Sequence, residues 1–441
     1  MNERPPHTPN SLFVSLAAAL VGVGVGVLAG AFRLATERLA NGLDGLSSAV
    51  AEWGVLAWCV PPLAVGVLAV AALWLVQHFA PESGGSGVQE IEGALSESRP
   101  LHWRRVLPTK FVGAIMALGG GMVLGREGPT IHMGGSIGAM LSEFFRFGKN
   151  ARHVSIAAGA AAGLSAAFNA PLSGVIFVVE EMRPQFRFGY LSFQALLIAS
   201  VCADVVTRVG FGQRHIIQTA DFLAPSLGSL PLFLVYGALL GAIAVVFSRS
   251  LIAVLDKADQ LSLRGRLVAA GLVGAGIGLV GIFDADLVGG GYGAIHTALG
   301  EHETIGALIF IFGIRFILTL ASYGSGVPGG IFAPMLALGV LLGVVFDLGV
   351  SEILPDLGAS PGMFAVAGMA AFFAATVRAP LTGIALTIEM TGNLDLMLPL
   401  LIACLAATST AEALGSRPIY EILLQRTLDR DGKSAEHSPS G

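Results

Sequence analysis

The stretch Gly125-Arg126-Glu127-Gly128-Pro129 places a carboxylate among helix-breaking residues, directly after the apolar Met122-Val123-Leu124. A second glycine-rich stretch, GSGVPGGIFAP, runs from Gly324 to Pro334 at the matching place in the second half of the chain. Helices that break inside a bilayer present backbone dipoles to ions and solutes. The two stretches therefore predict a site within the membrane, at the points where helices are interrupted.

The composition predicts an all-α, polytopic membrane protein. Of 441 residues, 54% are hydrophobic and only 12% are charged, which is too apolar for a water-soluble globular protein. Several apolar runs approach the roughly 20 residues that a helix needs to cross a bilayer, and others are short, long or interrupted by Gly and Pro. The runs are 12–32, 54–78, 106–124, 154–179, 189–206, 228–254, 267–283, 304–322, 331–350, 362–388 and 394–413.

One transmembrane transport domain is expected over residues 12–426, between a polar N-terminal tail, 1–11, and a polar C-terminal tail, 427–441. The first apolar run continues to Arg33 without a cleavage site, so we interpret it as a retained helix. Basic residues near the C-terminal end predict that this tail is cytoplasmic. The last residues, from Asp429 onward, are expected to be loose.

The two halves of the domain resemble copies of each other. Aligning Glu180 with Glu389 places the segment 169–174 (NAPLSG) opposite 378–383 (RAPLTG). A slightly different offset aligns Gly125–Gly138 with Gly330–Gly343, which pairs Pro129 with Pro334 in the two glycine-rich stretches. Duplicated hydrophobic segments with matching breaks are typical of secondary transporters, whose substrate site lies where the repeats meet. The repeats are expected at about 12–210 and 228–426, and their alignment alone leaves open whether they are inverted.

Glu127 is the most informative single residue. It follows an apolar segment and is expected at membrane depth, where a charge costs about 2.5–3.5 kcal/mol, so a carboxylate there usually has a function. The alternative is an ion pair with Arg126 or a surface position, although neighbours in sequence seldom point at each other. Pro129 suits the first turn of a helix, which leaves the N–H groups of Glu127 and Gly128 at a positive dipole end, where an anion is stabilised.

Two further breaks provide similar backbone donors. The segment 84–90 (GGSGVQE) precedes a helical stretch, and its amides, including that of Gly87, and the Ser86 hydroxyl are expected to donate to an anion. The stretch from Gly324 to Pro334 supplies Ile331 and Phe332 before its last proline. Each break taken alone is also explained as a hinge or a packing turn, but three breaks in one membrane chain favour an anion site.

Glu180 and Glu181 end the helix that begins at the first Ala-Pro-Leu segment. A pair of carboxylates there predicts an entry point for protons, with one acid solvated and the other facing inward. The alternative is two solvated charges at a helix end. The second repeat keeps Glu389 opposite Glu180 but has Met390 opposite Glu181, so the second acid is peculiar to the first half.

Other motifs do not support another chemistry. The segment 276–281 matches GxGxxG, but it lies in an apolar run without a strand before it, so helix packing explains it. The histidines show no metal-binding spacing, and the three cysteines are far apart in apolar runs. We therefore expect no metal, no cofactor, no nucleic-acid partner and no enzymatic activity.

Four motifs in this order closely resemble those of the CLC family of chloride channels and chloride/proton antiporters. They are 85–87 (GSG), 125–129 (GREGP), 180–186 (EEMRPQF) and 329–334 (GGIFAP). The similarity extends from about residue 80 to Tyr420. It implies an inverted-repeat fold of many tilted and broken helices. It also implies a homodimer in lipid with one anion pore per subunit.

The resemblance implies an anion site and two proton-carrying acids. In that family, the residues that match Ser86 and Tyr420 donate hydroxyls to the central chloride, with help from backbone amides that match Ile331 and Phe332. Taken by itself, Tyr420 would ordinarily be explained as an interfacial anchor.

The glutamate that matches Glu127 is the external gate of the family, which competes with chloride when ionised and carries a proton when neutral. Glu181 matches the internal proton glutamate of the antiporters. Arg126, Gly128 and Glu180 are expected to support these residues.

Some details refine the expectation. This chain has Gln89 where the family usually has proline, which affects the geometry of the helix start after Ser86. Serine at position 86 favours chloride over nitrate, and Pro129 with Ser86 disfavours the fluoride branch. A short C-terminal tail favours a prokaryotic inner-membrane protein with both termini in the cytoplasm.

The resulting hypothesis is a chloride/proton antiporter. A passive voltage- or pH-gated chloride channel of the same fold is the first alternative, and imposed chloride gradients that fail to drive protons would favour it. An intramembrane enzyme would need paired acids or His–Asp sets within apolar helices, and none is found. A transporter of another solute, such as an organic acid, would be revealed by competition with chloride uptake.

Overall fold

The structure is a computed structural model that describes residues 11–182, 189–213, 217, 225–300, 304–354 and 362–436. Residues 183–186 of the third motif and nearly all of the N-terminal tail lie outside the described residues. The longer helices are α1 (Ser11–Val50), α2 (Val55–Phe79), α4 (Trp103–Gly119), α5 (Glu127–Phe144), α6 (Lys149–Phe168), α8 (Tyr190–Phe211), α9 (Leu230–Asp259), α10 (Leu263–Phe283), α12 (Ile305–Gly324), α13 (Phe332–Ile353), α14 (Met363–Val377), α16 (Met397–Ala413) and α17 (Ile419–Glu436). The shorter helices are α3 (Val88–Leu95), α7 (Pro171–Glu181), α11 (Tyr292–Gly300) and α15 (Pro380–Thr391), with single 3-10 turns η1 (Pro81–Ser83), η2 (Leu227–Ser229), η3 (Ala285–Leu287) and η5 (Leu394–Leu396).

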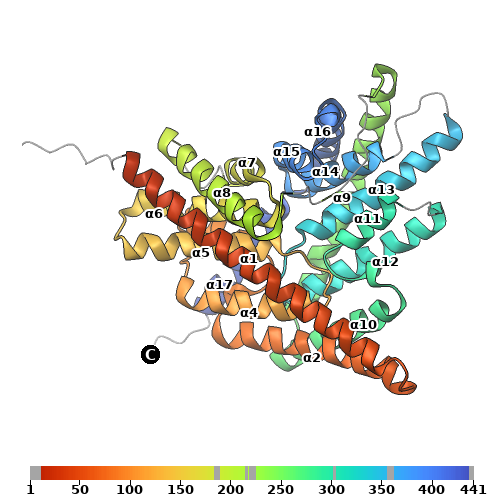
Figure 1. The fold of residues 1–441 in the computed structure, drawn as a ribbon, viewed down its shortest axis with the longest axis horizontal. Coiled ribbons are helices and arrows are strands. Elements are labelled where there is room, and N and C mark those ends of the chain that lie inside the picture. The colour runs from red at the N-terminus through yellow and green to blue at the C-terminus, as the bar shows by residue number, and fades with distance from the viewer. Residues whose placement is uncertain are drawn as a thin grey trace, which may run out of the picture.

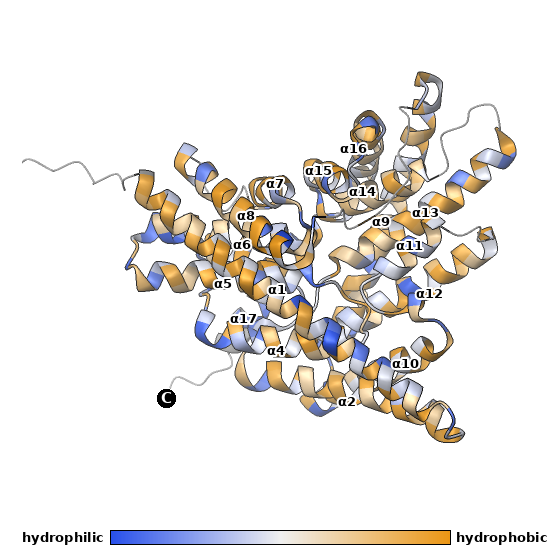
Figure 2. Cartoon of the chain, in the orientation of Figure 1, coloured by the Kyte–Doolittle hydropathy of each residue, from blue (hydrophilic) through white to orange (hydrophobic). Residues whose placement is uncertain are grey.

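The predicted all-α membrane fold is confirmed. No strand occurs among the described residues, and 8 of their helices are long and apolar enough to cross a membrane. Figure 1 shows α1 lying across the molecule, where it packs against α8, α6 and α4. Hydrophobic residues cover most of the length of the long outer helices (Figure 2). Apolar side chains on the outside are what a protein in contact with lipid tails requires.

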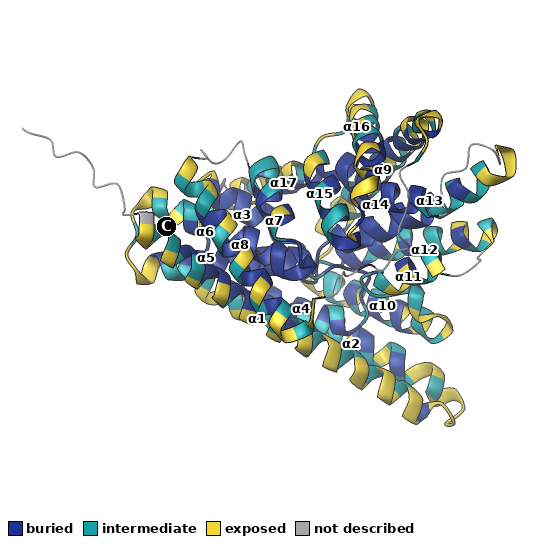
Figure 3. Ribbon diagram, turned by 45° about the horizontal axis from the view of Figure 1, so that its top comes forward, coloured by how far each residue is buried: buried dark blue, intermediate teal, exposed yellow. Residues whose placement is uncertain are grey.

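The most buried helices lie at the centre of the molecule. Nearly every residue of α5 and α14 is buried, whereas α1 and α2 expose one side along their length (Figure 3). Glycines allow the central helices to approach closely. A Cβ on Gly134 would lie 2.1 Å from the carbonyl oxygen of Gly159, and one on Gly339 would lie 2.2 Å from that of Gly368. The α5–α6 and α13–α14 pairs therefore repeat the same contact, and small residues at such crossings let membrane helices pack tightly.

The two Ala-Pro-Leu segments break their apolar runs at equivalent residues. The predicted run 154–179 forms two helices, α6 and α7, and the run 362–388 forms α14 and α15. The breaks occur at Asn169 and Arg378, whose backbones are left-handed, with φ of 51° and 71°. Pro171 and Pro380 then start the next helix, because proline fits the first turn but not a helix interior.

Reciprocal capping fixes the relative direction of α7 and α15. The Glu389 carboxylate at the end of α15 accepts hydrogen bonds from the Leu172 and Ser173 N–H groups at the start of α7, at 3.0 and 2.7 Å. Glu180 at the end of α7 accepts bonds from the Leu381 and Thr382 N–H groups at the start of α15, at 3.0 and 2.8 Å. Each helix therefore ends where the other begins, so the equivalent helices are antiparallel and the repeats are inverted.

The C-terminal part differs from the expectation. Residues 427–441 were expected to be a polar tail, loose from Asp429, but α17 continues to Glu436. The expectation fails because Leu423 and Thr427 bury one side of this helix, while Arg426 and Arg430 form ion pairs with Asp259 of α9. The expected boundary of the transport domain at residue 426 thus falls inside α17.

Candidate functional site

The three glycine-rich breaks meet at one place in the fold. Gly125 and Gly330 exchange two backbone hydrogen bonds, with N–O distances of 2.7 and 2.8 Å. The Gly85 N–H donates to the Val327 carbonyl at 3.2 Å, and the Gly329 N–H donates to the Gly85 carbonyl at 2.9 Å. These bonds bring together segments that lie about 40 and 200 residues apart in the sequence, so the breaks form a single structural unit rather than three separate hinges.

Helices begin directly after each break. Gly87, with φ of 89°, precedes α3, and its left-handed backbone favours glycine. The α5 helix begins at Glu127 and the α13 helix at Phe332, with Ile331 as its N-cap residue. The first turns of these helices carry backbone N–H groups with no partner in their own helix, together with the positive end of the helix dipole. The sequence-predicted anion donors are thus found at helix N-termini.

Two unpaired hydroxyls lie beside these helix starts. Ser86 and Tyr420 are both 0% exposed, and neither hydroxyl has a hydrogen-bond partner of good geometry among the described residues. Tyr420 comes from the first turn of α17 and lies within interaction range of Ser86. A buried hydroxyl without a partner is costly, so two of them side by side indicate a place for a ligand that accepts hydrogen bonds.

A separate set of contacts supports the loop that carries Ser86. The Lys110 ammonium group is fully buried and donates to the carbonyl oxygens of Ser83 and Gly85, at 3.0 and 2.7 Å. The Ser86 N–H donates to the Tyr323 hydroxyl at 3.4 Å. The His132 side chain fills the space beside Gly87, so a side chain at position 87 would collide with it. Neither Lys110 nor Tyr323 was predicted from the sequence.

Glu127 is fully buried at the junction of α5 and α13. Its Oε1 accepts a hydrogen bond from the Tyr292 hydroxyl at 2.9 Å, while Oε2 has no hydrogen bond of good geometry among the described residues. The carboxylate lies within interaction range of the backbone N–H groups of Glu127 and Ala333. The carboxylate therefore occupies a position where two helix N-termini converge. An anion of similar size would be stabilised at the same place.

Arg126 does not form the alternative ion pair with Glu127. Its guanidinium group donates to the Ala167 carbonyl at 3.0 Å and lies 5.5 Å from the centre of the Tyr292 ring. Tyr292, on α11, was not predicted as a site residue, yet it contacts both Arg126 and Glu127. The Arg126 charge thus stays near the Glu127 carboxylate without neutralising it through direct contact.

Gly128 and Phe332 have mainly packing roles in the described structure. A Cβ on Gly128 would lie 2.4 Å from the Ser86 hydroxyl oxygen, so only glycine lets α5 approach the Ser86 loop. The Phe332 ring packs against Phe168, Phe177 and Phe373, with ring centres 4.2 to 6.0 Å apart. This packing fixes the start of α13, so that its backbone points toward the same junction.

The two acids at the end of α7 have different surroundings. Glu180 accepts the backbone and hydroxyl hydrogen bonds that cap α15, so it is a structural residue rather than the solvated member of a proton pair. Glu181 is half-buried, and its carboxyl group lies within interaction range of Glu92 of α3. Two carboxyl groups in contact share a proton, because two negative charges so close repel each other. Glu92 was not predicted as a site residue. The one feature of the sequence that could have pointed to it is its position two residues after Glu90, in the segment that follows Ser86.

The described residues contain no group of three or more His, Cys, Asp or Glu side chains that is arranged to hold a metal ion. Within this part of the chain, the site is made of hydroxyls, carboxylates and backbone N–H groups. Such donors suit a small anion, and a buried carboxylate among them suits the transfer of protons.

Together, the antiparallel repeats and the meeting of broken helices around a buried carboxylate define a transport protein of the inverted-repeat class. Comparison with known proteins identifies the family. A family model described as "Voltage gated chloride channel" matches residues 68–412, and the chain belongs to this family, the CLC family indicated by the motifs.

Two curated relatives have the name H(+)/Cl(-) exchange transporter ClcA. The protein of Yersinia pestis bv. Antiqua (strain Angola) is 44% identical over 421 residues, which cover 95% of this chain and 88% of that protein. The protein of Citrobacter koseri is 42% identical over 432 residues, which cover 97% and 91%. A solved structure described as a slow cyanobacterial Cl-/H+ antiporter is 42% identical, with a TM-score of 0.93 over 98% of this chain and 100% of that one.

Proposed function

We propose that this protein is a secondary active antiporter that exchanges chloride for protons across a membrane. The observation that carries the proposal is the position of Glu127, a buried carboxylate between the N-terminal ends of α5 and α13. The names of the curated relatives and of the cyanobacterial structure support the same activity. The alternative remains a passive voltage- or pH-gated chloride channel of the same fold.

Chloride is the transported anion in this proposal. It binds between the hydroxyls of Ser86 and Tyr420, with the backbone N–H groups near Gly87, Ile331 and Phe332 providing further positive potential. In the described part of the chain, no Lys or Arg side chain donates a hydrogen bond to either of these hydroxyls. Partial charges bind an anion strongly enough to select it and weakly enough to release it, which transport requires.

Glu127 acts as the external gate and as a proton acceptor. When ionised, its carboxylate occupies the junction of helix N-termini and competes with chloride for it. When neutral, it loses most of its attraction to the helix dipoles and leaves the junction to the anion. Because only one of the two can hold the position, movement of chloride becomes linked to movement of protons.

Glu181 acts as the internal proton relay. Its contact with Glu92 supports this role, because a pair of carboxyl groups can hold and pass on one proton. Protons then travel between Glu181 and Glu127 through an apolar region, and transient water is required on the way. Arg126 and Gly128 support the gate, and Glu180 supports the helix that carries Glu181.

The assembly and location follow from the family resemblance. We propose a homodimer in the lipid of a cell inner membrane, with both termini in the cytoplasm. Exposed apolar residues on α8 and α16, among them Val201, Val205 and Leu405, provide a surface for either lipid or a second subunit. Chloride is the substrate, no cofactor takes part, and the protein is a transporter rather than an enzyme.

Coupled flux measurements test the proposed function. The protein is purified, reconstituted into liposomes and exposed to a chloride gradient with no proton gradient, while chloride and proton movements are recorded together. An antiporter drives protons uphill until the two gradients balance, whereas a channel moves chloride alone. An excess of a competing organic acid that suppresses radiolabelled chloride uptake would instead indicate a different substrate.

A further inference from the structure

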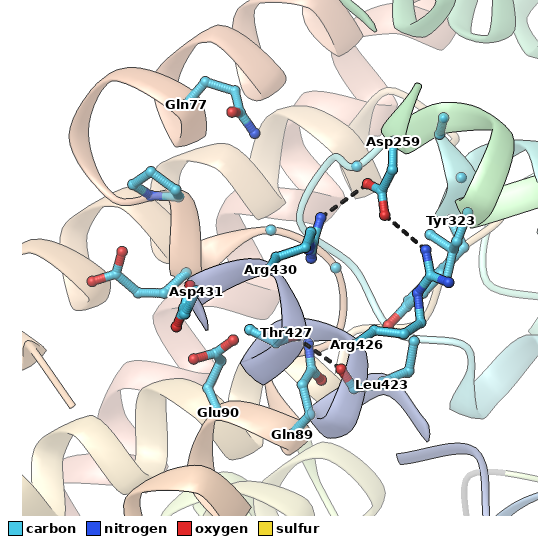
Figure 4. A pocket seen from close by; sticks show the side chains of 18 of the residues that line it. Gln77, Gln89, Glu90, Asp259, Tyr323, Leu423, Arg426, Thr427, Arg430 and Asp431 are labelled. Atoms are coloured by element: carbon cyan, nitrogen blue, oxygen red, sulfur yellow. Dashed lines mark hydrogen bonds and ion pairs between the residues drawn. The ribbon is translucent and has the colours of Figure 1, made fainter. Parts of the chain in front are cut away.

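Several ion pairs connect α17 to α9. Arg426 of α17 pairs with Asp256 and Asp259, its Nη2 lying 2.7 Å from Oδ2 of Asp259. One turn further along, Nη1 of Arg430 lies 2.9 Å from Oδ1 of Asp259. Figure 4 shows both arginines pointing toward Asp259 from the same side of the helix. The last turn of α9 thus binds two successive turns of α17.

A second connection joins α17 to the helix that follows Ser86. Nε of Arg99 lies 3.0 Å from the Asp431 carboxylate of α17, and Nη1 of Arg99 lies 2.5 Å from the Glu90 carboxylate of α3. Arg99 therefore bridges the two helices at whose N-terminal ends the unpaired hydroxyls of the anion site lie. Ser86 lies just before α3 and Tyr420 in the first turn of α17.

These ion pairs surround a cavity, so side-chain packing alone does not hold α17 in this region. The cavity has a volume of about 230 Å³ and is lined by Asp259, Arg99, Arg426 and Asp431, and also by Gly85 of the Ser86 loop. Isolated exposed ion pairs contribute little to stability. Here the side chains of Arg426 and Arg99 are only 18% and 16% exposed, and each joins two carboxylates, so the pairs form two small networks that both include residues of α17.

We propose that these two networks, together the α17 clamp (Arg426 and Arg430 with Asp256 and Asp259, and Arg99 with Asp431 and Glu90), position the Tyr420 hydroxyl opposite Ser86 and thereby set the affinity for the transported anion. The proposal rests on the proposed chloride exchange. Tyr420 lies six residues before Arg426, which is about 9 Å along a rigid helix at 1.5 Å per residue. A shift of the clamped part of α17 therefore moves Tyr420.

Among the described residues, no hydrogen bond of good geometry holds the Tyr420 hydroxyl independently of its helix. Its distance from Ser86 is therefore decided by the helix position and by the packing of the buried Ile419, Leu423 and Leu424. Arg426 and Arg99 act at a distance from the anion, so they are positioning residues and not ligands. Loosening the clamp is expected to weaken anion binding without removing the site.

The test compares Arg426→Gln with Arg417→Gln in reconstituted protein. Arg417 lies two residues before α17, and its ion pair among the described residues is with Glu421 in the first turn of that helix, at the exposed surface, so it is the matched control. We expect Arg426→Gln to raise the chloride concentration for half-maximal transport by about three- to tenfold, with a smaller effect on the maximal rate. Arg426→Lys is expected to restore most of the affinity, and Arg417→Gln to leave it unchanged.

A double-mutant cycle with Tyr420→Phe identifies the mechanism. If the clamp acts through the Tyr420 hydroxyl, Arg426→Gln adds little to the loss caused by Tyr420→Phe. Full additivity, or equal effects of Arg426→Gln and Arg417→Gln, would overturn the proposal. If Arg426→Gln does not fold, Asp259→Asn is measured in the same cycle, with chloride binding to detergent-solubilised protein as a second readout. In the same assays, the unsubstituted protein shows whether coupled exchange itself occurs. Failure of the proposed exchange is therefore distinguished from failure of the α17 clamp.

Discussion

Glu127 is the residue at which anion and proton movement meet in the proposed mechanism. Glu127→Gln keeps the size and one acceptor oxygen but removes the ability to ionise. We expect proton flux to fall to background and chloride flux to become independent of pH, because the neutral side chain no longer competes as an anion. Both fluxes are measured in liposomes over a range of pH, and chloride flux that still varies with pH would contradict the role of Glu127.

Glu181 separates the proton path from the chloride path. Glu181→Gln is expected to abolish proton transport while chloride transport continues, because an amide cannot take up and release a proton as a carboxyl group does, and neither Glu181 nor Glu92 is a proposed donor to the anion. Glu180→Gln is the matched control. Because the Glu180 carboxylate caps α15, this variant is expected to leave the coupling of chloride to protons intact. Retained proton transport in Glu181→Gln would remove Glu181 from the mechanism.

Sequence reasoning found the site residues that lie within motifs and missed those that reach the site from elsewhere. Glu127 and Ser86 could be identified because an acid at membrane depth and a glycine-rich break are unusual in an apolar chain. Tyr292 could not be identified, because it contacts Glu127 across 165 residues of sequence and its own segment has no distinctive pattern. From the sequence, Glu180 is expected to take part in proton entry. Its structural role could not be predicted, because only the structure reveals that its carboxylate caps another helix, α15.

At the scale of elements, the reciprocal caps are expected to stabilise both repeats equally. Glu180→Gln and Glu389→Gln each replace a carboxylate that accepts two backbone hydrogen bonds, so each should cost about 1–2 kcal/mol of stability. Thermal unfolding in detergent measures the loss for both variants. A large loss in one variant and none in the other would contradict the equivalence of the two caps.

The glycine crossings of α5 with α6 and of α13 with α14 provide a second prediction at this scale. Gly134→Ala and Gly339→Ala would each place a Cβ about 2 Å from a backbone oxygen, which forces the helices apart. We expect each to destabilise the protein by about 1–3 kcal/mol, as over-packing does. Gly276→Ala, where a Cβ meets nothing within 4 Å, is the control. Equal thermal stability of all three variants would contradict the close packing.

The apolar pattern predicted most elements, and particular residues explain where it failed. Proline and glycine indicated the breaks before α5 and α13, and the Ala-Pro-Leu repeat indicated a related pair of helices. The split of each long run into two helices could not be located, because Asn169 and Arg378 adopt left-handed backbones that their residue types do not specify. The length of α17 was missed because its polar residues look loose until their partners on α9 are known.

For the whole molecule, the alignment of the repeats predicted a duplication but not its direction. The antiparallel arrangement of α7 and α15 became evident only from the carboxylates that cap the opposite helix. Inversion brings the helix breaks of both halves to one place. Neither half alone could form the site that results. The central claim is therefore that an anion binds where these breaks meet.

Anomalous diffraction from crystals soaked in bromide tests this claim most directly. Bromide resembles chloride in charge and size, and its signal identifies it without ambiguity. We predict a peak between the hydroxyls of Ser86 and Tyr420, and a second peak at the junction of α5 and α13 when Glu127 is replaced by Gln. Crystals that bind bromide elsewhere but give no peak beside these residues would contradict the account.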